Sequence, residues 1–331
     1  MKAGKAAAAL LGLTLIGGAL SGCHLGAGDG RTPANIQFVV DTGPGGGSDV
    51  FARQVLKIAQ QAKIVDSNWP VLSKPQGGGL GAMAYMAGRG SKNNVIAAFT
   101  SKWIVSGMAT KDAPATLGRL TPIAELAEEQ QVVAVPEDSP YRTFADFVAD
   151  AQRRPGTLVQ VGGASFSVDN LVALKYEKDA GTTWKYLSFA DDGPRITALL
   201  RGDAQMMIGA ESDFSEQVAA HQLKVIGVLG DRRSPSFPDV PTLSEQGLSS
   251  AGLPQQLQFR GIAGPPGMSA QSVKYYADLF AKLVKTPAWQ RYIHSEGNVT
   301  RFLTGDALKK QIATFTTSMK PLVARLHQGN T

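Results

Sequence analysis

The 331-residue chain has a single cysteine and only four histidines, which leaves few of the side chains that bind transition metals or perform thiol chemistry. The histidines are scattered, with no spacing typical of a metal site, and we expect surface positions for all of them: His24, His221, His294 and His327. No Gly-x-Ser-x-Gly motif anchors a hydrolase triad. We therefore expect no metal, no cofactor and no enzymatic activity.

Strong charge of one sign is also missing. Lysine and arginine number 33 against 27 acidic residues, and aromatic residues make up only 7% of the chain. No basic cluster alternates with aromatic side chains, so the sequence gives no support for nucleic-acid binding. A net charge of +6 is compatible with a small acidic ligand. We expect a monomer.

The N-terminus has the pattern of a secretory signal, with Lys2 and Lys5 before an apolar run over residues 6–20. The run is too short for a typical membrane span. Leu20-Ser21-Gly22-Cys23 resembles a bacterial lipobox, which predicts a signal peptide at 1–22, lipidation of Cys23 and a polar tether over 23–33. An ordinary signal peptide with an incidental cysteine is the alternative. We expect a periplasmic protein that is anchored to a membrane by lipid.

Apolar runs typical of strands alternate with segments of helical period, which predicts an α/β protein with mostly parallel sheets. The expected strands are 36–40, 95–99, 131–135, 158–161, 205–208, 225–229 and 259–263. Thr143 is expected to cap a helix that begins near Phe144. One lobe would comprise 34–133 and 257–331, and a second lobe, 134–256, would be inserted into it. Two crossings of this kind predict a ligand cleft between the lobes.

A glycine-rich turn after the first strand is the most informative motif. Its amide groups and the following helix N-terminus suit an anion, and its candidate ligand-binding residues are Pro44, Gly45, Gly46, Gly47, Ser48 and Asp49. A second cluster supplies Gly78 and Gly79. The turn after strand 158–161 repeats the pattern and adds Gly163, Ala164, Ser165, Ser167 and Asp169. Simple tight turns are the alternative interpretation. If the loops converge, amides and hydroxyls from both lobes would bind a carboxylate.

Nucleotide binding fits these loops poorly. The first loop lacks the Gly-Lys-Ser/Thr ending of a phosphate loop. The second matches Gly-x-Gly-x-x-Ala, but strand 95–99 ends in Thr100, Ser101 and Lys102 where a dinucleotide site needs an acidic residue. Instead, we count these three residues among the candidate ligand contacts. Lys102 is either an ordinary surface lysine or a compensating charge at the mouth of the site.

Several motifs, in one order along the chain, resemble the substrate-binding receptors of tripartite tricarboxylate transporters, also called Bug receptors. The resemblance rests on Pro44–Arg53, Lys74–Gly79, Ala198–Asp203, Phe237–Gly247 and Arg260–Gly267. Gln76 and Phe259 depart from the family pattern, with Phe259 in place of a tryptophan. The resemblance implies a two-lobe periplasmic-binding-protein-like fold that closes on a carboxylated metabolite, a tricarboxylate or dicarboxylate, and presents it to membrane permease subunits.

Two acidic groups could change the specificity: Asp191-Asp192 and Glu211-Ser212-Asp213. If they face the cleft, they would repel a tricarboxylate, or accept a ligand ammonium or a bridging cation. The alternative is a solvated helix start for each group. Three further functions stay open at this point. These are a sensor subunit for a membrane signalling system, an extracytoplasmic enzyme on a related scaffold, and a scaffold that binds a partner without ligand.

Overall fold

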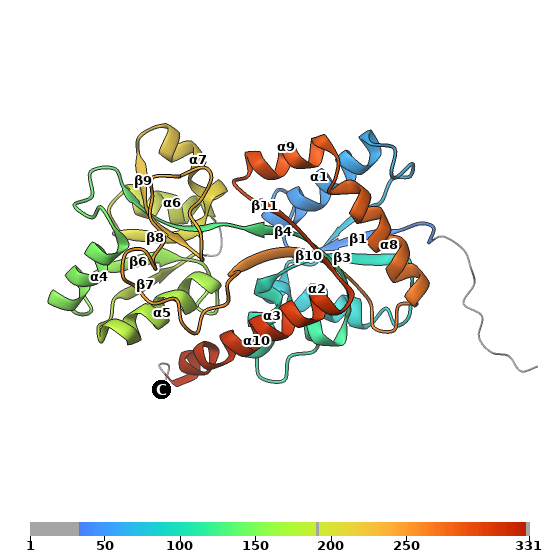
Figure 1. Cartoon of the computed structure of the whole chain (residues 1–331). Coiled ribbons are helices and arrows are strands. Elements are labelled where there is room, and N and C mark those ends of the chain that lie inside the picture. Colours follow the sequence, from blue (N-terminus) through green and yellow to red (C-terminus); the bar gives the residue numbers. More distant parts are fainter. Residues whose placement is uncertain (1–32, 190–191, 329–331) are drawn as a thin grey trace, which may run out of the picture. The chain divides into compact units, whose positions relative to one another are not determined.

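Two β-sheets organise the protein in a computed structural model that describes residues 33–189 and 192–328 (Figure 1). The first sheet has the order β11-β4-β10-β3-β1-β2, with β1 Gln37–Val40, β2 Val71–Ser73, β3 Val95–Thr100, β4 Thr121–Glu129, β10 Gln258–Gly264 and β11 Val299–Thr304. The second has the order β7-β6-β8-β5-β9, with β5 Gln131–Pro136, β6 Val159–Gly162, β7 Lys185–Ser188, β8 Met206–Ala210 and β9 Leu223–Leu229. The predicted signal peptide and Cys23 lie outside the described residues.

Helices cover both faces of each sheet. In the first lobe they are α1 Gly47–Gln61, α2 Leu80–Ala87, α3 Ser101–Ala109, α8 Ala270–Leu283, α9 Pro287–Ser295 and α10 Gly305–Gln328, with 3-10 turns η1 Gln76–Gly79 and η2 Leu117–Arg119. In the second lobe they are α4 Phe144–Arg153, α5 Val168–Ala180, α6 Asp192–Leu200 and α7 Glu211–Ala219. The predicted cap is confirmed, since Thr143 Oγ1 accepts the amide of Asp146 in a capping box. The α/β fold class is likewise confirmed.

The prediction of mostly parallel sheets is wrong. Strand β1 runs parallel to β2 and β3, and β6 runs parallel to β7 and β8. However, β10 is antiparallel to β3 and β4, β11 to β4, and β5 to β8 and β9. Parallel neighbouring strands are usually joined by a crossover connection that contains a helix. Strands β5 and β10 have no such connection to their neighbours, because the chain enters the second sheet at β5 and re-enters the first sheet at β10. Apolar periodicity carries no information about this direction.

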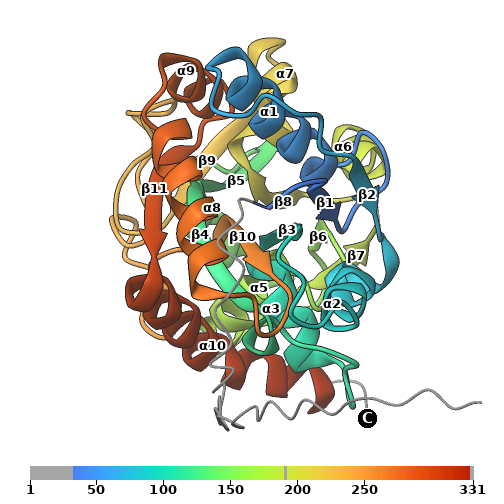
Figure 2. The same ribbon diagram turned by 90° about the vertical axis from the view of Figure 1, so that its right-hand side faces the viewer.

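Three apolar clusters form the core. Helices α1, α8 and α9 pack on one face of the first sheet, through residues such as Phe51, Tyr276 and Trp289 (Figure 2). Helices α6 and α7 contribute Leu199 and Phe214 to a small cluster on the second sheet. The third cluster includes α2, α3 and α10 from the first lobe and α4 and α5 from the second. The two lobes therefore share one continuous apolar core.

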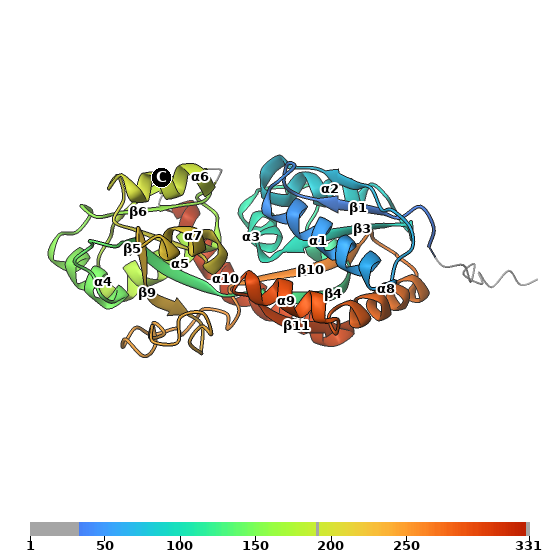
Figure 3. The ribbon, with the colours of Figure 1, turned by 90° about the horizontal axis from the view of Figure 1, so that it is seen from above.

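The chain passes directly from β4 to β5 through Gln130, and it returns from β9 to β10 through residues 230–257 (Figure 3). The two crossings lie together, because Gln130 Nε2 donates to Leu229 O at 2.5 Å. Helix α10 contacts both α3 and α5, and Arg325 Nη1 donates to Leu174 O at 2.8 Å. The lobe boundaries at 133/134 and 256/257 stay predictions, and the first of them falls within β5. Among the helices of the described residues, none combines the length and apolar character needed to cross a membrane.

Candidate functional site

The first glycine loop connects the end of β1 to α1 and is held in shape by its own polar groups. The Asp49 carboxylate accepts the Gly45 amide at 3.0 Å and Arg53 Nε at 2.9 Å. Gly46 N donates to Gly43 O at 3.0 Å, and Asp49 N donates to Thr42 Oγ1 at 3.1 Å. These bonds use several of the predicted ligand-binding groups internally.

Two amides of the first helical turn are left over for a ligand. The first N–H groups of a helix have no partner within the helix itself. Val50 N donates to Gly46 O, and Asp49 N is taken by Thr42. Gly47 N and Ser48 N have no backbone partner within residues 33–189 and 192–328. The N-terminus of α1 therefore keeps the donor capacity that an anion needs.

Beneath this loop lies Asp41, a residue that the sequence analysis did not single out. It is 3% exposed, accepts Ser48 Oγ at 2.5 Å and pairs with Lys102 Nζ at 3.0 Å. Burial alone would raise the pKa of Asp41, but the Lys102 charge and the hydrogen bond from Ser48 outweigh it and lower the pKa. Lys102 is therefore not an isolated surface charge, because its ammonium is paired with a buried carboxylate.

The second glycine loop is η1, in which Gly77, Gly78 and Gly79 all have positive φ, at 62°, 61° and 107°. Ser106 Oγ donates to Gly78 O at 2.8 Å. A Cβ on Gly79 would lie 2.5 Å from Trp103 Cδ1, so the backbone approaches the indole as closely as only glycine permits. Both the conformation and the contact fix glycine at this position.

The two hydroxyls at the end of β3 differ in role. Ser101 Oγ donates to Leu257 O at 3.0 Å and also contacts Gln258 Oε1, so it ties α3 to the return crossing. Thr100 is 5% exposed, and its Oγ1 has no hydrogen-bond partner among the described residues. A buried hydroxyl without a partner is costly.

The loop from β6 to α5 repeats the construction of the first loop. The Asp169 carboxylate accepts the Gly163 amide at 3.0 Å and the Tyr186 hydroxyl at 2.7 Å. Burial, and then the Asp169 charge, raise the pKa of Tyr186, which therefore stays a donor. Ser188 Oγ donates to Gly163 O at 2.7 Å, and Ser167 N donates to Ala164 O at 2.8 Å. In both lobes, an aspartate in the first turn of the helix fixes the glycine loop before it. Asp49 and Asp169 thus position the loops.

The structure brings the loops of the two lobes into contact. Phe166 Cε2 lies 3.1 Å from the position that a Gly78 Cβ would occupy. Two arginines that the sequence analysis did not count as site residues lie beside the loops. Arg260 Nη1 donates to Gly47 O at 3.2 Å, and Arg195 Nη2 lies 3.6 Å from the Cβ position of Gly163. Arginine side chains therefore border loops from both lobes, and Arg260 is also paired with Glu129. In the sequence, Arg260 stood out only as part of the Arg260–Gly267 motif, and nothing pointed to Arg195.

The predicted acidic contacts do not gather at these loops as far as the structure describes them. Asp191 lies outside the described residues, and Asp192 opens α6 with a side chain that is not described. Asp213 Oδ2 accepts the Ala210 amide at 2.9 Å and so caps α7. Glu211 is only 2% exposed, which differs from a solvated helix start. Burial raises the pKa of Glu211, and the Glu211 carboxylate packs against Gly297 in the other lobe.

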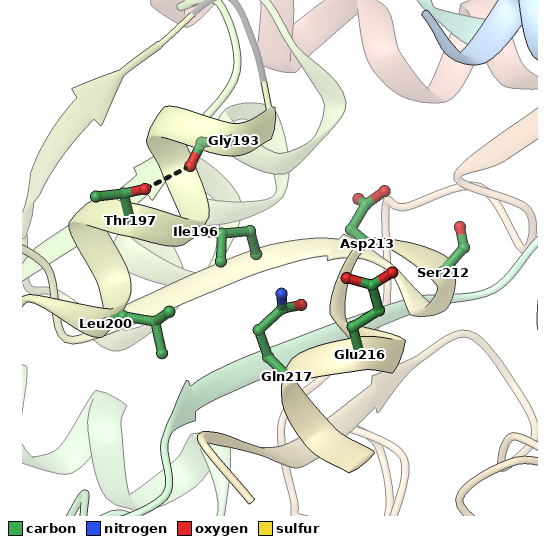
Figure 4. A pocket seen from close by; sticks show the side chains of 8 residues that line it. All are labelled: Gly193, Ile196, Thr197, Leu200, Ser212, Asp213, Glu216 and Gln217. Carbon is green, nitrogen blue, oxygen red and sulfur yellow. Dashed lines mark hydrogen bonds between the residues drawn. The ribbon is translucent and has the colours of Figure 1, made fainter. Parts of the chain in front are cut away.

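A cavity of about 470 Å³ lies between α6 and α7 (Figure 4). Apolar side chains of α6 and polar side chains of α7 line it: Gly193, Ile196, Thr197, Leu200, Ser212, Asp213, Glu216 and Gln217. It offers one carboxylate pair and no basic side chain, so it suits a carboxylate ligand poorly. Within the described part of the chain, no group of three or more His, Cys, Asp or Glu residues could hold a metal ion.

Two lobes with separate sheets, joined by two crossings, give the chain the two-lobe fold that periplasmic solute-binding proteins have. Solved structures with this fold superpose on the chain. Rhodopseudomonas palustris Rpa4515 with adipate has a TM-score of 0.76 at 15% identity, covering 88% of this chain and 97% of that one. MatC (Rpa3494) from Rhodopseudomonas palustris with bound malate has a TM-score of 0.70 at 17% identity, covering 89% and 99%.

The sequence itself identifies the family. The model described as "Tripartite tricarboxylate transporter family receptor" matches residues 51–326, and the chain belongs to this family. A relative from Cupriavidus necator, "UPF0065 protein in gbd 5'region", is 26% identical over 259 residues, which are 77% of this chain and 76% of that protein. The resemblance found in the sequence motifs is therefore confirmed.

Proposed function

We propose that this protein is an extracytoplasmic receptor that binds a small dicarboxylate or tricarboxylate and delivers it to the permease subunits of a tripartite tricarboxylate-type transporter. The observation that carries the proposal is the donor set: the leftover amides of Gly47 and Ser48 at the α1 N-terminus and the unpartnered Thr100 hydroxyl. Arg260 and Arg195 add positive charge beside loops of each lobe. Adipate and malate in the two superposable structures support the ligand class.

Ligand binding would favour the closed arrangement of the lobes, since only that state brings donors from both lobes around the same carboxylate. The role is binding without turnover. Members of the family are receptors, which supports this role. The family supports the transport part of the proposal, whereas the loops support the ligand-binding part.

Isothermal titration calorimetry with succinate, malate, adipate and citrate tests the proposal directly. We expect saturable binding of at least one acid and none of putrescine, a diamine of similar length. The Thr100→Val variant removes the buried hydroxyl but keeps the side-chain shape, so it should weaken binding about tenfold without loss of thermal stability. Thr317→Val, on the exposed side of α10, is the matched control and should bind like the wild type. Absence of binding to all four acids, or their conversion to products, would contradict the proposal.

The membrane anchor is a separate part of the proposal and rests on the sequence around Cys23. We expect the native protein to fractionate with membranes and a Cys23→Ser variant to appear in the soluble periplasmic fraction. Mass spectrometry of the mature N-terminus should find a diacylglyceryl-modified cysteine. An unmodified cysteine at an internal position would show that this segment has another role.

A further inference from the structure

A single aromatic side chain interrupts the small and hydroxyl-bearing residues of the loop from β6 to α5. Phe166 is half-buried and packs against the apolar core that the two lobes share. Its Cε2 and Cζ atoms lie 3.1 Å and 3.7 Å from the Cβ position of Gly78 in the other lobe. Ser106 Oγ lies 3.0 Å from the same position. The ring is therefore in direct contact with the backbone of a predicted ligand-binding loop.

The position of the ring is set by the loop that carries it. Asn170 Nδ2 donates to Ser165 O at 2.5 Å, and Ser167 N donates to Ala164 O at 2.8 Å, so hydrogen bonds brace the residues on both sides of Phe166. The opposing glycine has a φ of 61°, a conformation that side chains rarely adopt. The contact thus joins a ring on a braced loop to a turn whose conformation favours glycine.

This contact has a chemical consequence for any ligand held between the loops. The amides and hydroxyls around it suit a carboxylate, but the ring offers neither a donor nor an acceptor. A ligand methylene beside the ring gains apolar contact, whereas a ligand hydroxyl there loses water and finds no partner on that side. The two loops and the Phe166 ring together therefore favour a ligand with a carboxylate group on an unsubstituted hydrocarbon chain.

We propose that Phe166 is a specificity-determining residue, which selects carboxylates with an unsubstituted carbon chain over their hydroxylated counterparts. The inference rests on the proposed function and narrows its ligand class to carboxylates without a hydroxyl group beside Phe166.

Two matched ligand pairs separate the effect from ligand size and charge: succinate with malate, and tricarballylate with citrate. Each pair differs by one hydroxyl group. Calorimetry on the wild type should give at least tenfold tighter binding of the unsubstituted acid in each pair whose members bind, a preference of about 1.4 kcal/mol. Phe166→Ser should reduce the ratio to less than about threefold, and Phe166→Leu, which keeps an apolar surface, should retain most of it.

Phe237→Ser is the matched control, because Phe237 lies in the same lobe but packs against a different cluster. In Phe237→Ser, the ratio of affinities for the unsubstituted and the hydroxylated acid should equal that of the wild type. Thermal unfolding of each variant checks that it is folded. A ratio that stays unchanged in Phe166→Ser overturns the inference, as does a wild-type preference for malate or an equal loss of affinity for both members of a pair. The last result would mean that the ring only holds the lobes together. Failure of the wild type to bind any of the four acids would overturn the proposed function as well.

Discussion

Replacement of Glu125 by glutamine should stabilise the protein at neutral pH. Glu125 lies on β4 with no exposed surface, and neither carboxylate oxygen has a hydrogen-bond partner among the described residues. Arg301 Nε lies 3.6 Å from Glu125 Oε1, and Glu128 adds a second negative charge nearby. Burial is the dominant effect and raises the pKa of Glu125 from 4.5 to about 8, although Arg301 opposes it.

The sign and size of the effect follow from the difference in pKa between the two states. In the unfolded chain the carboxyl ionises above its ordinary pKa, whereas in the folded protein it stays protonated up to about pH 8. Stability therefore falls as the pH rises from about 4.5 to about 8, by about 1.4 kcal/mol for each pH unit. The cost reaches about 3 kcal/mol at pH 7 and is below about 1 kcal/mol at pH 5. Glu125→Gln removes this dependence.

Urea unfolding at pH 5 and pH 7, followed by tryptophan fluorescence and circular dichroism, measures the difference. Agreement between the two signals establishes whether the two lobes unfold together. The glutamine variant should gain about 2 to 3 kcal/mol relative to the wild type between pH 5 and pH 7. Asp306→Asn, at a fully exposed side chain, is the control and should show no such gain. If Glu125→Gln instead loses stability at pH 7, the carboxylate is ionised in the fold and its pair with Arg301 outweighs burial.

Two further substitutions test the loops. Gly79→Ala combines a φ of 107° with a 2.5 Å clash against Trp103, so it should cost about 2 kcal/mol or more and abolish carboxylate binding. Gly90→Ala, whose Cβ meets nothing within 4 Å, should cost only about 1 kcal/mol in the same thermal unfolding assay, and equal losses would refute the argument. Lys102→Met leaves Asp41 as an unpaired buried charge and should lower stability by about 3 kcal/mol at pH 7. Because the folded pKa of Asp41 is lowered, this loss should shrink as the pH falls below about 4, and a loss independent of pH would argue against the ion pair.

Local patterns in the sequence predicted the elements well, because capping and glycine chemistry act over a few residues. Thr143 was identified as a helix cap from its own position, and the turn at Gly43–Gly47 follows from its composition. Strand direction in β5 and β10 could not be predicted, since it depends on how the chain crosses between two sheets.

The pairing and burial of charged side chains were predicted less well, because they too depend on contacts between distant segments of the chain. Asp41 and Lys102 are 61 residues apart in the chain, and their ion pair exists only because β1 and β3 are adjacent. The burial of Glu211 likewise depends on Gly297 in the other lobe. A sequence shows which residues carry charge, but only the packing of distant segments decides which charges meet.

The central claim is that the glycine loops of both lobes lie against the same carboxylate. Nuclear magnetic resonance of protein labelled with ¹⁵N-glycine, titrated with succinate and with adipate, observes the glycine amides of these loops directly. The account predicts that the signals of Gly47, Gly78 and Gly163 shift together and saturably, while the signal of Gly90 stays in place. A saturating acid that leaves those three signals unchanged, and shifts only Gly193 in the cavity between α6 and α7, would contradict it.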